Sequence, residues 1–165
     1  MPADLAQQIS ALSDPDPAKR SGAAEDLSRL GPDAREAAVP LARACADEVE
    51  EVREWAVAAL EELGPPRPVD CDPLSDLLTH QSPDVGYWAA TLLGRLKDEA
   101  SGAAPALADA LGAPLDLSVR QRAAWALGQI GPPAAAALGA LKQAERAPDA
   151  RLARLARQAI ERISG

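Results

Sequence analysis

The chain has 165 residues, of which 47% are hydrophobic, and its formal net charge at pH 7 is −8. This length suits one compact domain or a short array of repeats. The acidic balance disfavours sequence-independent binding to nucleic acid or to an anionic membrane, and no apolar run is long enough to form a transmembrane helix.

Apolar residues recur with helical periodicity in every part of the chain, which predicts alternating outer and inner helices. In chain order we expect helices at 3–12, 16–30, 34–46, 50–63, 72–80, 83–96, 103–112, 117–130, 134–146 and 149–163. The second member of each pair, here called the inner helix, has the stronger apolar stripe. The pairs predict five repeats within a single domain over 1–165, at about 1–31, 32–64, 65–97, 98–131 and 132–165.

The inner helices end on the same kind of residue at a nearly constant spacing. Steps of 33, 33, 34 and 33 residues separate Leu30, Leu63, Leu96, Ile130 and Ile163. Glycine followed by proline comes directly after three of these residues, at Gly31, Gly64 and Gly131. Such glycines can adopt the backbone conformation that ends a helix. Self-similarity at this period is typical of a solenoid of stacked helix pairs.

Charge is distributed unevenly along these predicted repeats. Residues 1–70 contain 15 acidic and 7 basic side chains, whereas residues 140–165 contain 3 acidic and 6 basic ones. The basic end is typical of a solvated last helix, and a docking patch for an acidic partner is the alternative interpretation.

The sequence VRQRAAWALGQIG, from Val119 to Gly131, resembles the HEAT repeat, and is closest to the short bacterial type also found in phycobilisome lyases. The resemblance covers essentially the whole chain as five repeats. It implies an all-α fold, a right-handed α-solenoid. HEAT families often place an aspartate six residues before an inner-helix arginine, as in Asp14 with Arg20 and Asp47 with Arg53. The resemblance implies that such pairs link neighbouring repeats, and the later repeats lose the pattern.

No arrangement of residues in the sequence points to catalysis, a metal or a cofactor. His80 is the only histidine, so we interpret it as a structural hydrogen-bonding residue. Cys45 and Cys71 form no paired motif, and the first residues do not have the pattern of a secretory signal. Both observations favour the cytoplasm, and the resemblance to the bacterial type of HEAT repeat implies a bacterium. We therefore predict that the protein is not an enzyme.

All four aromatic residues fall on inner helices, which line the concave face in HEAT arrays. This placement predicts a partner-binding surface on that face, although tryptophans at these positions could instead pack between adjacent helices. The predicted binding residues are Glu54, Trp55, Tyr87, Trp88, Thr91, Arg95, Gln121, Arg122, Trp125, Gln129 and Gln158.

These observations predict a non-catalytic scaffold or adaptor that binds a partner protein or peptide on its concave face. One alternative is a structural subunit that assembles with itself or within a larger complex. Another alternative, implied by the resemblance, is an accessory subunit of a bilin-lyase-like enzyme. Nucleic acid is disfavoured because few basic residues fall on the predicted face, and no membrane partner is expected.

Overall fold

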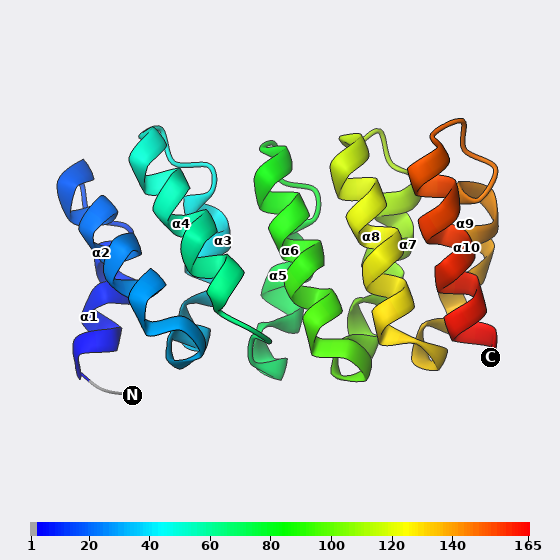
Figure 1. Ribbon diagram of the computed structural model, residues 1–165, viewed down its shortest axis with the longest axis horizontal. Helices are drawn as coiled ribbons and strands as arrows, with labels where there is room; N and C mark the ends of the chain where they lie inside the picture. Colours follow the sequence, from blue (N-terminus) through cyan, green and yellow to red (C-terminus); the bar gives the residue numbers. More distant parts are fainter. Residues whose placement is uncertain (1–2) are drawn as a thin grey trace. The chain divides into compact units, whose positions relative to one another are not determined.

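The computed structural model describes residues 3–165, and all the regular elements in this range are helices (Figure 1). The chain divides into two compact units, one ending at Arg67 and the other beginning at Pro68. This boundary lies within the proline-rich connector from Pro65 to Pro73. The all-α solenoid class is confirmed, and the grouping of all five repeats into one domain stays a prediction.

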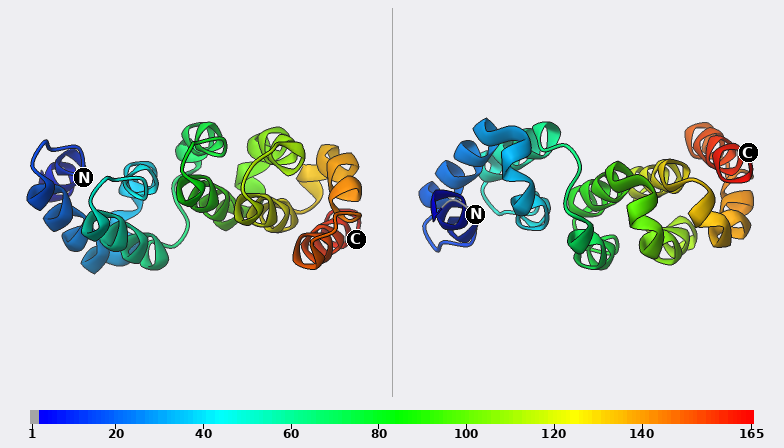
Figure 2. Two further views of the ribbon diagram at one scale, coloured as in Figure 1. Left: turned by 90° about the horizontal axis from the view of Figure 1, so that it is seen from above. Right: turned by 90° about the horizontal axis from the view of Figure 1, so that it is seen from below.

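The first unit contains two helix pairs. Its helices are α1 (Ala3–Ala11), α2 (Pro17–Leu30), α3 (Ala38–Ala44) and α4 (Glu50–Glu62). The inner helices α2 and α4 pack against each other, and α1 and α3 each pack against the inner helix that follows them in the chain. Figure 2 shows this arrangement as two layers of helices within the unit.

The second unit contains three helix pairs. Its helices are α5 (Cys71–Leu77), α6 (Pro83–Leu96), α7 (Ala104–Gly112), α8 (Leu117–Ile130), α9 (Leu138–Ala144) and α10 (Ala150–Ser164). The inner helices α6, α8 and α10 form one layer, with α8 packed against both α6 and α10 (Figure 2). The outer helices α5, α7 and α9 form the other layer.

The predicted inner helices agree with the observed ones to within one residue at each end, whereas some outer helices begin later than predicted. The α-helical parts of α3 and α9 start four residues after the predicted positions. The preceding residues, Gly31–Ala37 and Pro132–Ala137, instead form 3-10 turns. Such tighter turns commonly occur at helix termini, where the regular α-helical hydrogen bonds are not yet established.

The apolar stripe of the inner helices forms the core of both units. Leu27 and Leu60 in the first unit and Leu93 and Leu127 in the second occupy equivalent repeat positions, and all four are fully buried. The alanines four residues before them are also buried, at Ala23, Ala56, Ala89 and Ala123. Small side chains at this position let neighbouring helices approach closely, so the leucines fill the remaining space.

Three of the connections after inner helices depend on glycine. Gly31, Gly64 and Gly131 have φ values of 52°, 73° and 74°, in the region that favours glycine. The third repeat has Lys97 at the equivalent place, and this lysine adopts a φ of 55°. The turn geometry is therefore retained where the glycine–proline pair has been replaced.

One buried ion pair links the first two repeats. Arg20 on α2 donates two hydrogen bonds to the Asp47 carboxylate, with Nε–Oδ2 and Nη2–Oδ1 distances of 2.7 and 3.0 Å. Only 10% and 11% of the two side-chain surfaces are exposed. The predicted link between neighbouring repeats thus joins Arg20 to Asp47. Arg53 donates to the backbone carbonyls of Asp47 and Glu48, as Arg20 does to those of Asp14 and Pro15 one repeat earlier.

This ion pair leads us to expect that stability depends on pH through Asp47. Burial disfavours the charged carboxylate, but hydrogen bonds from Arg20 and from the Val49 N–H, together with nearby positive charge, outweigh it and hold the pKa of Asp47 below its ordinary value. The stabilisation is therefore present above the unfolded-state pKa of about 3.9, and is lost as the pH falls through the folded-state pKa. Asp47→Asn should lower the free energy of unfolding at pH 7 and flatten its decrease between about pH 5 and pH 3.

Urea denaturation at a series of pH values, followed by circular dichroism, measures this effect. The exposed variant Asp33→Asn is the matched control and should follow the wild-type curve. If the free energy of unfolding of Asp47→Asn decreased at acid pH as much as that of the wild type, Asp47 would not be the source of the pH dependence.

Candidate functional site

A cluster of two aromatic rings and one arginine joins α6 to α8. We call Tyr87, Arg122 and Trp125 the aromatic–arginine cluster. Arg122 donates a hydrogen bond to the Tyr87 hydroxyl oxygen. Its guanidinium carbon lies 4.4 Å from the centroid of the Tyr87 ring and 4.9 Å from that of the Trp125 ring. All three side chains are half-buried, so the cluster is held by neighbouring atoms and still reaches the surface.

A glycine on α6 makes room for the indole ring of this cluster. A Cβ atom at Gly94 would overlap the Trp125 side chain, so the ring lies directly against the α6 backbone. Cation–π contacts with Arg122 then fix the guanidinium beside the ring. The cluster is consequently preorganised, since each member is restrained by another member or by α6.

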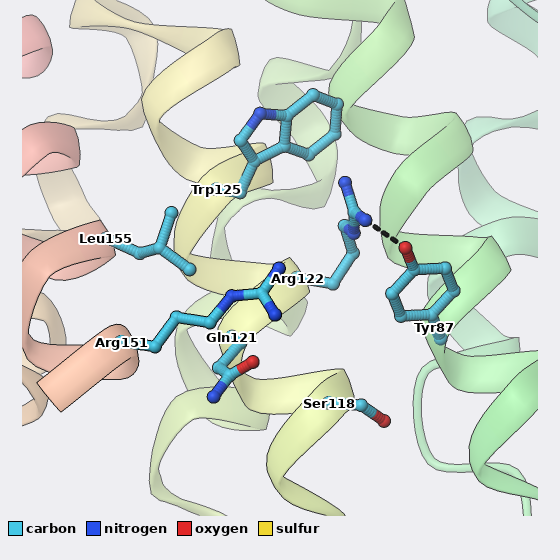
Figure 3. Close-up of a pocket in the computed structure, with 7 residues that line it drawn as sticks. All are labelled: Tyr87, Ser118, Gln121, Arg122, Trp125, Arg151 and Leu155. Carbon is cyan, nitrogen blue, oxygen red and sulfur yellow. Dashed lines mark hydrogen bonds between the residues drawn. The ribbon is translucent and has the colours of Figure 1, made fainter. Parts of the chain in front are cut away.

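Two shallow hollows adjoin the aromatic–arginine cluster on the inner-helix face of the second unit. The first has a volume of about 150 Å³ and is lined by Tyr87, Ser118, Gln121, Arg122, Trp125, Arg151 and Leu155 (Figure 3). The second, of about 30 Å³, is lined by Ala124, Trp125, Gly128, Leu155, Gln158, Ala159 and Arg162. Trp125 and Leu155 line both, so the two hollows are neighbours. Neither lining includes a carboxylate.

A hydrogen bond between side chains fixes the edge of the first hollow. Gln121 on α8 donates from Nε2 to the Asp149 carboxylate at 2.9 Å. Asp149 also caps α10 by accepting from the Leu152 N–H at 2.7 Å. These bonds, the backbone one first, hold the pKa of Asp149 below its ordinary value, so the carboxylate is charged at neutral pH. The bond therefore positions the start of α10 against α8.

Two of the predicted binding residues lie in the interior. Trp88 is only 8% exposed, and its ring packs edge-on against Tyr87 with 5.7 Å between centroids. Thr91 is 5% exposed and donates its hydroxyl to the Tyr87 carbonyl at 2.8 Å. Both therefore pack beside Tyr87 in the interior, which corrects their placement on the binding surface, and for Trp88 fits the alternative that a tryptophan packs between helices. We leave Trp88 and Thr91 out of the binding face.

The remaining predicted residues of the second unit differ in where they lie. The Arg95 guanidinium carbon lies 5.7 Å from the centroid of the Trp88 ring. Gln121, Arg122, Trp125 and Gln158 line the hollows, whereas half-buried Gln129 lines neither of them. The structure thus brings together Tyr87, Gln121, Arg122, Trp125 and Gln158.

Glu54 and Trp55 belong to α4 in the first unit and are described with that unit. Glu54 is exposed and lines an open hollow of about 340 Å³ with Glu50, Arg53 and Val57. Trp55 is half-buried. Glu54 therefore lies in a hollow with a second glutamate and one arginine, and Trp55 is not among the residues that line it.

The list of predicted residues omitted three that line the first hollow: Ser118, Arg151 and Leu155. For two of them the sequence contains a signal. Arg151, Leu155, Gln158 and Arg162 follow one another at spacings of four, three and four residues, which places them along one side of α10. The prediction started from the aromatic residues, so of these four residues it included only Gln158.

Within residues 3–165 the structure contains no group of three or more potential metal ligands and no helix with the length and apolar character needed to cross a membrane. His80 accepts a hydrogen bond at Nδ1 from the Ser82 N–H, 3.0 Å away. This bond confirms the interpretation of His80 as a local structural residue.

The repeats identify the family of this chain. A family model described as HEAT repeats matches residues 5–80 and again residues 71–161. The chain belongs to the HEAT-repeat family. No curated protein matches this HEAT-repeat chain in sequence.

Solved structures with a similar fold include natural and designed repeat proteins. One chain in the complex of CpcE and CpcF of phycocyanin lyase from Nostoc sp. PCC7120 is 26% identical to this chain, with a TM-score of 0.69. The match covers 97% of this chain and 65% of the lyase chain. A designed armadillo repeat protein in complex with the peptide (KR)4 gives 18% identity and a TM-score of 0.66 over 96% and 81% of the two chains. An engineered protein gives 21% identity and a TM-score of 0.65 over 99% of this chain and 48% of the other. The HEAT-repeat chain therefore spans about half of the engineered protein and just under two thirds of the lyase chain.

Proposed function

We propose that this HEAT-repeat protein is a non-catalytic scaffold that binds a partner protein or peptide on the inner-helix face of its second unit. The aromatic–arginine cluster is the observation that carries the proposal. It places an arginine and two aromatic rings, partly exposed, on two helices that pack against each other. We place the scaffold in the cytoplasm, where Cys45 and Cys71, which form no disulfide, would stay reduced.

Two physical arguments support this binding face. Tryptophan, tyrosine and arginine account for much of the binding energy in protein–protein interfaces. A preorganised cluster also loses little side-chain freedom when a partner binds, which lowers the entropic cost of association. The designed armadillo protein, which has a similar fold, was solved with a bound peptide, and this favours an extended peptide as one form of the partner.

Affinity capture from a lysate of the native host tests the location of the face. We expect Arg122→Glu to lose a partner that the wild type retains, because the substitution reverses the charge of the cluster. The control Arg146→Glu makes the same change of net charge at an exposed residue outside both hollows. A partner retained equally by all three proteins would overturn the placement of the binding face.

The similarity to the CpcE and CpcF complex supports a second candidate, an accessory subunit of a bilin-lyase-like enzyme. In this case the same face would contact a chromophore or its carrier protein. Co-expression with a bilin supply, followed by visible absorbance of the purified protein, tests this candidate. A colourless protein that still captures a partner through Arg122 would favour the scaffold.

A further inference from the structure

We propose that the partner segment bound on this face is an acidic peptide whose carboxylates pair with Arg122, Arg151 and Arg162. This inference rests on the proposed function and adds the chemistry of the partner. It follows from the charge of the surrounding face, the spacing of its arginines and the volumes of the two hollows.

The charge of the inner-helix face is opposite to that of the whole chain. Helix α10 contains four arginines and a single acidic residue, and α8 contains two arginines and none, although the net charge of the protein is −8. Three arginines and no carboxylate line the hollows. The local surface therefore favours a negatively charged ligand.

Within the described residues none of these three arginines forms a salt bridge, although the positive charge of Arg151 acts on the adjacent Asp149 carboxylate. Arg122 donates to the uncharged Tyr87 hydroxyl, and neither Arg151 nor Arg162 forms a salt bridge. One oxygen of the adjacent Asp149 carboxylate, Oδ1, accepts from the Leu152 N–H and from Gln121. Arginine forms strong, often bidentate hydrogen bonds with carboxylates, so this face offers donors that the chain itself does not use.

The spacing of the arginines suits an extended chain. Arg151 and Arg162 lie eleven residues apart on α10, which corresponds to about 16 Å along the helix axis. An extended peptide covers this distance with about five residues. Leu155 and Trp125 line the stretch between the two arginines and provide an apolar contact there. A peptide with acidic residues at both ends of such a segment matches this order.

The hollows are a poor match for the other anionic ligands. Their volumes of about 150 and 30 Å³ are smaller than the roughly 300–1,000 Å³ typical of sites that enclose a small molecule. Binding of single-stranded nucleic acid depends on aromatic rings that are free to stack on bases. Trp125 already lies against Gly94 and beside Arg122, so its ring is occupied within the protein.

Fluorescence anisotropy with labelled (Asp-Glu)4 peptide tests the proposal on the full chain at about 50 mM salt, where charge interactions are only partly screened. We expect saturable binding that Arg122→Glu and Arg151→Glu each weaken about tenfold or more. The matched control Arg146→Glu should change the affinity by less than about threefold. Arg151 is exposed, so its variant should keep the wild-type helicity, which circular dichroism verifies.

Several results would overturn the proposal. Equal weakening by Arg146→Glu would mean that the peptide senses only net charge. Tighter binding of (KR)4 or of an oligothymidine would identify a different class of partner. Sedimentation that reveals self-association abolished by Arg151→Glu would identify a second copy as the occupant. If the acidic peptide fails to bind while Arg122→Glu still loses the captured partner, the acidic chemistry is wrong and the scaffold proposal stands.

Discussion

Leu127→Ala is expected to lower the free energy of unfolding of the second unit by about 3 kcal/mol. Leu127 is fully buried on α8, which packs against α6, α7 and α10. Truncation removes buried methyl groups and leaves a cavity, because helices held on several sides cannot close around it. The loss of unfolding free energy should therefore lie within the range measured for Leu→Ala substitutions at buried positions.

Urea denaturation followed by tryptophan fluorescence measures this change, since Trp88 and Trp125 report on the second unit. The matched control is Leu117→Ala on the same helix, where the leucine is 40% exposed, and we expect this variant to lose less than about 1 kcal/mol. Equal losses for the two variants would contradict the central place of Leu127 in the core.

Gly86→Arg is expected to destabilise the second unit by about 3 kcal/mol, although it restores a residue that recurs at this repeat position. Arg20, Arg53 and Arg120 occupy the equivalent places in three other repeats. At Gly86, however, a Cβ atom would lie 2.9 Å from the Leu78 carbonyl oxygen and 3.1 Å from a Val119 methyl group. Because a backbone atom is involved, α6 would have to move away from its neighbours.

The thermal unfolding midpoint, followed by circular dichroism, measures this effect. Gly139→Arg is the matched control, since no atom outside its own helix and its chain neighbours lies within 4 Å of a Cβ built there. Replacing the exposed Gly139 near the start of α9 should leave stability unchanged or raise it by up to about 1 kcal/mol. A stable Gly86→Arg protein would mean that α6 and α8 tolerate a wider separation than the structure has.

Much of the local structure could be predicted from the sequence. The inner helices were located to within one residue, because their apolar stripe and their terminal glycines are signals carried by neighbouring residues. The predicted N-terminal ends of the outer helices α3 and α9 were less accurate. There the chain forms 3-10 turns, and weak periodicity does not distinguish these turns from α-helix.

The candidate site could be predicted only in part. Placing the aromatic residues on inner helices identified Tyr87, Arg122 and Trp125, but it could not separate Trp125 from Trp88. Both tryptophans lie on inner helices, yet only Trp88 is buried. Their difference depends on neighbours that are distant in sequence, such as Gly94, which accepts the Trp125 ring on a different helix.

The sequence by itself determined the family, the helix pairs and the repeat period, because these follow from the order of residues along each helix. The tertiary structure alone decided which side chains reach the surface and which arginines stay without a carboxylate partner. It also decided that the third repeat requires glycine at position 86, where three other repeats have arginine. These properties depend on the distance between packed helices, which is determined by side chains from several repeats at once.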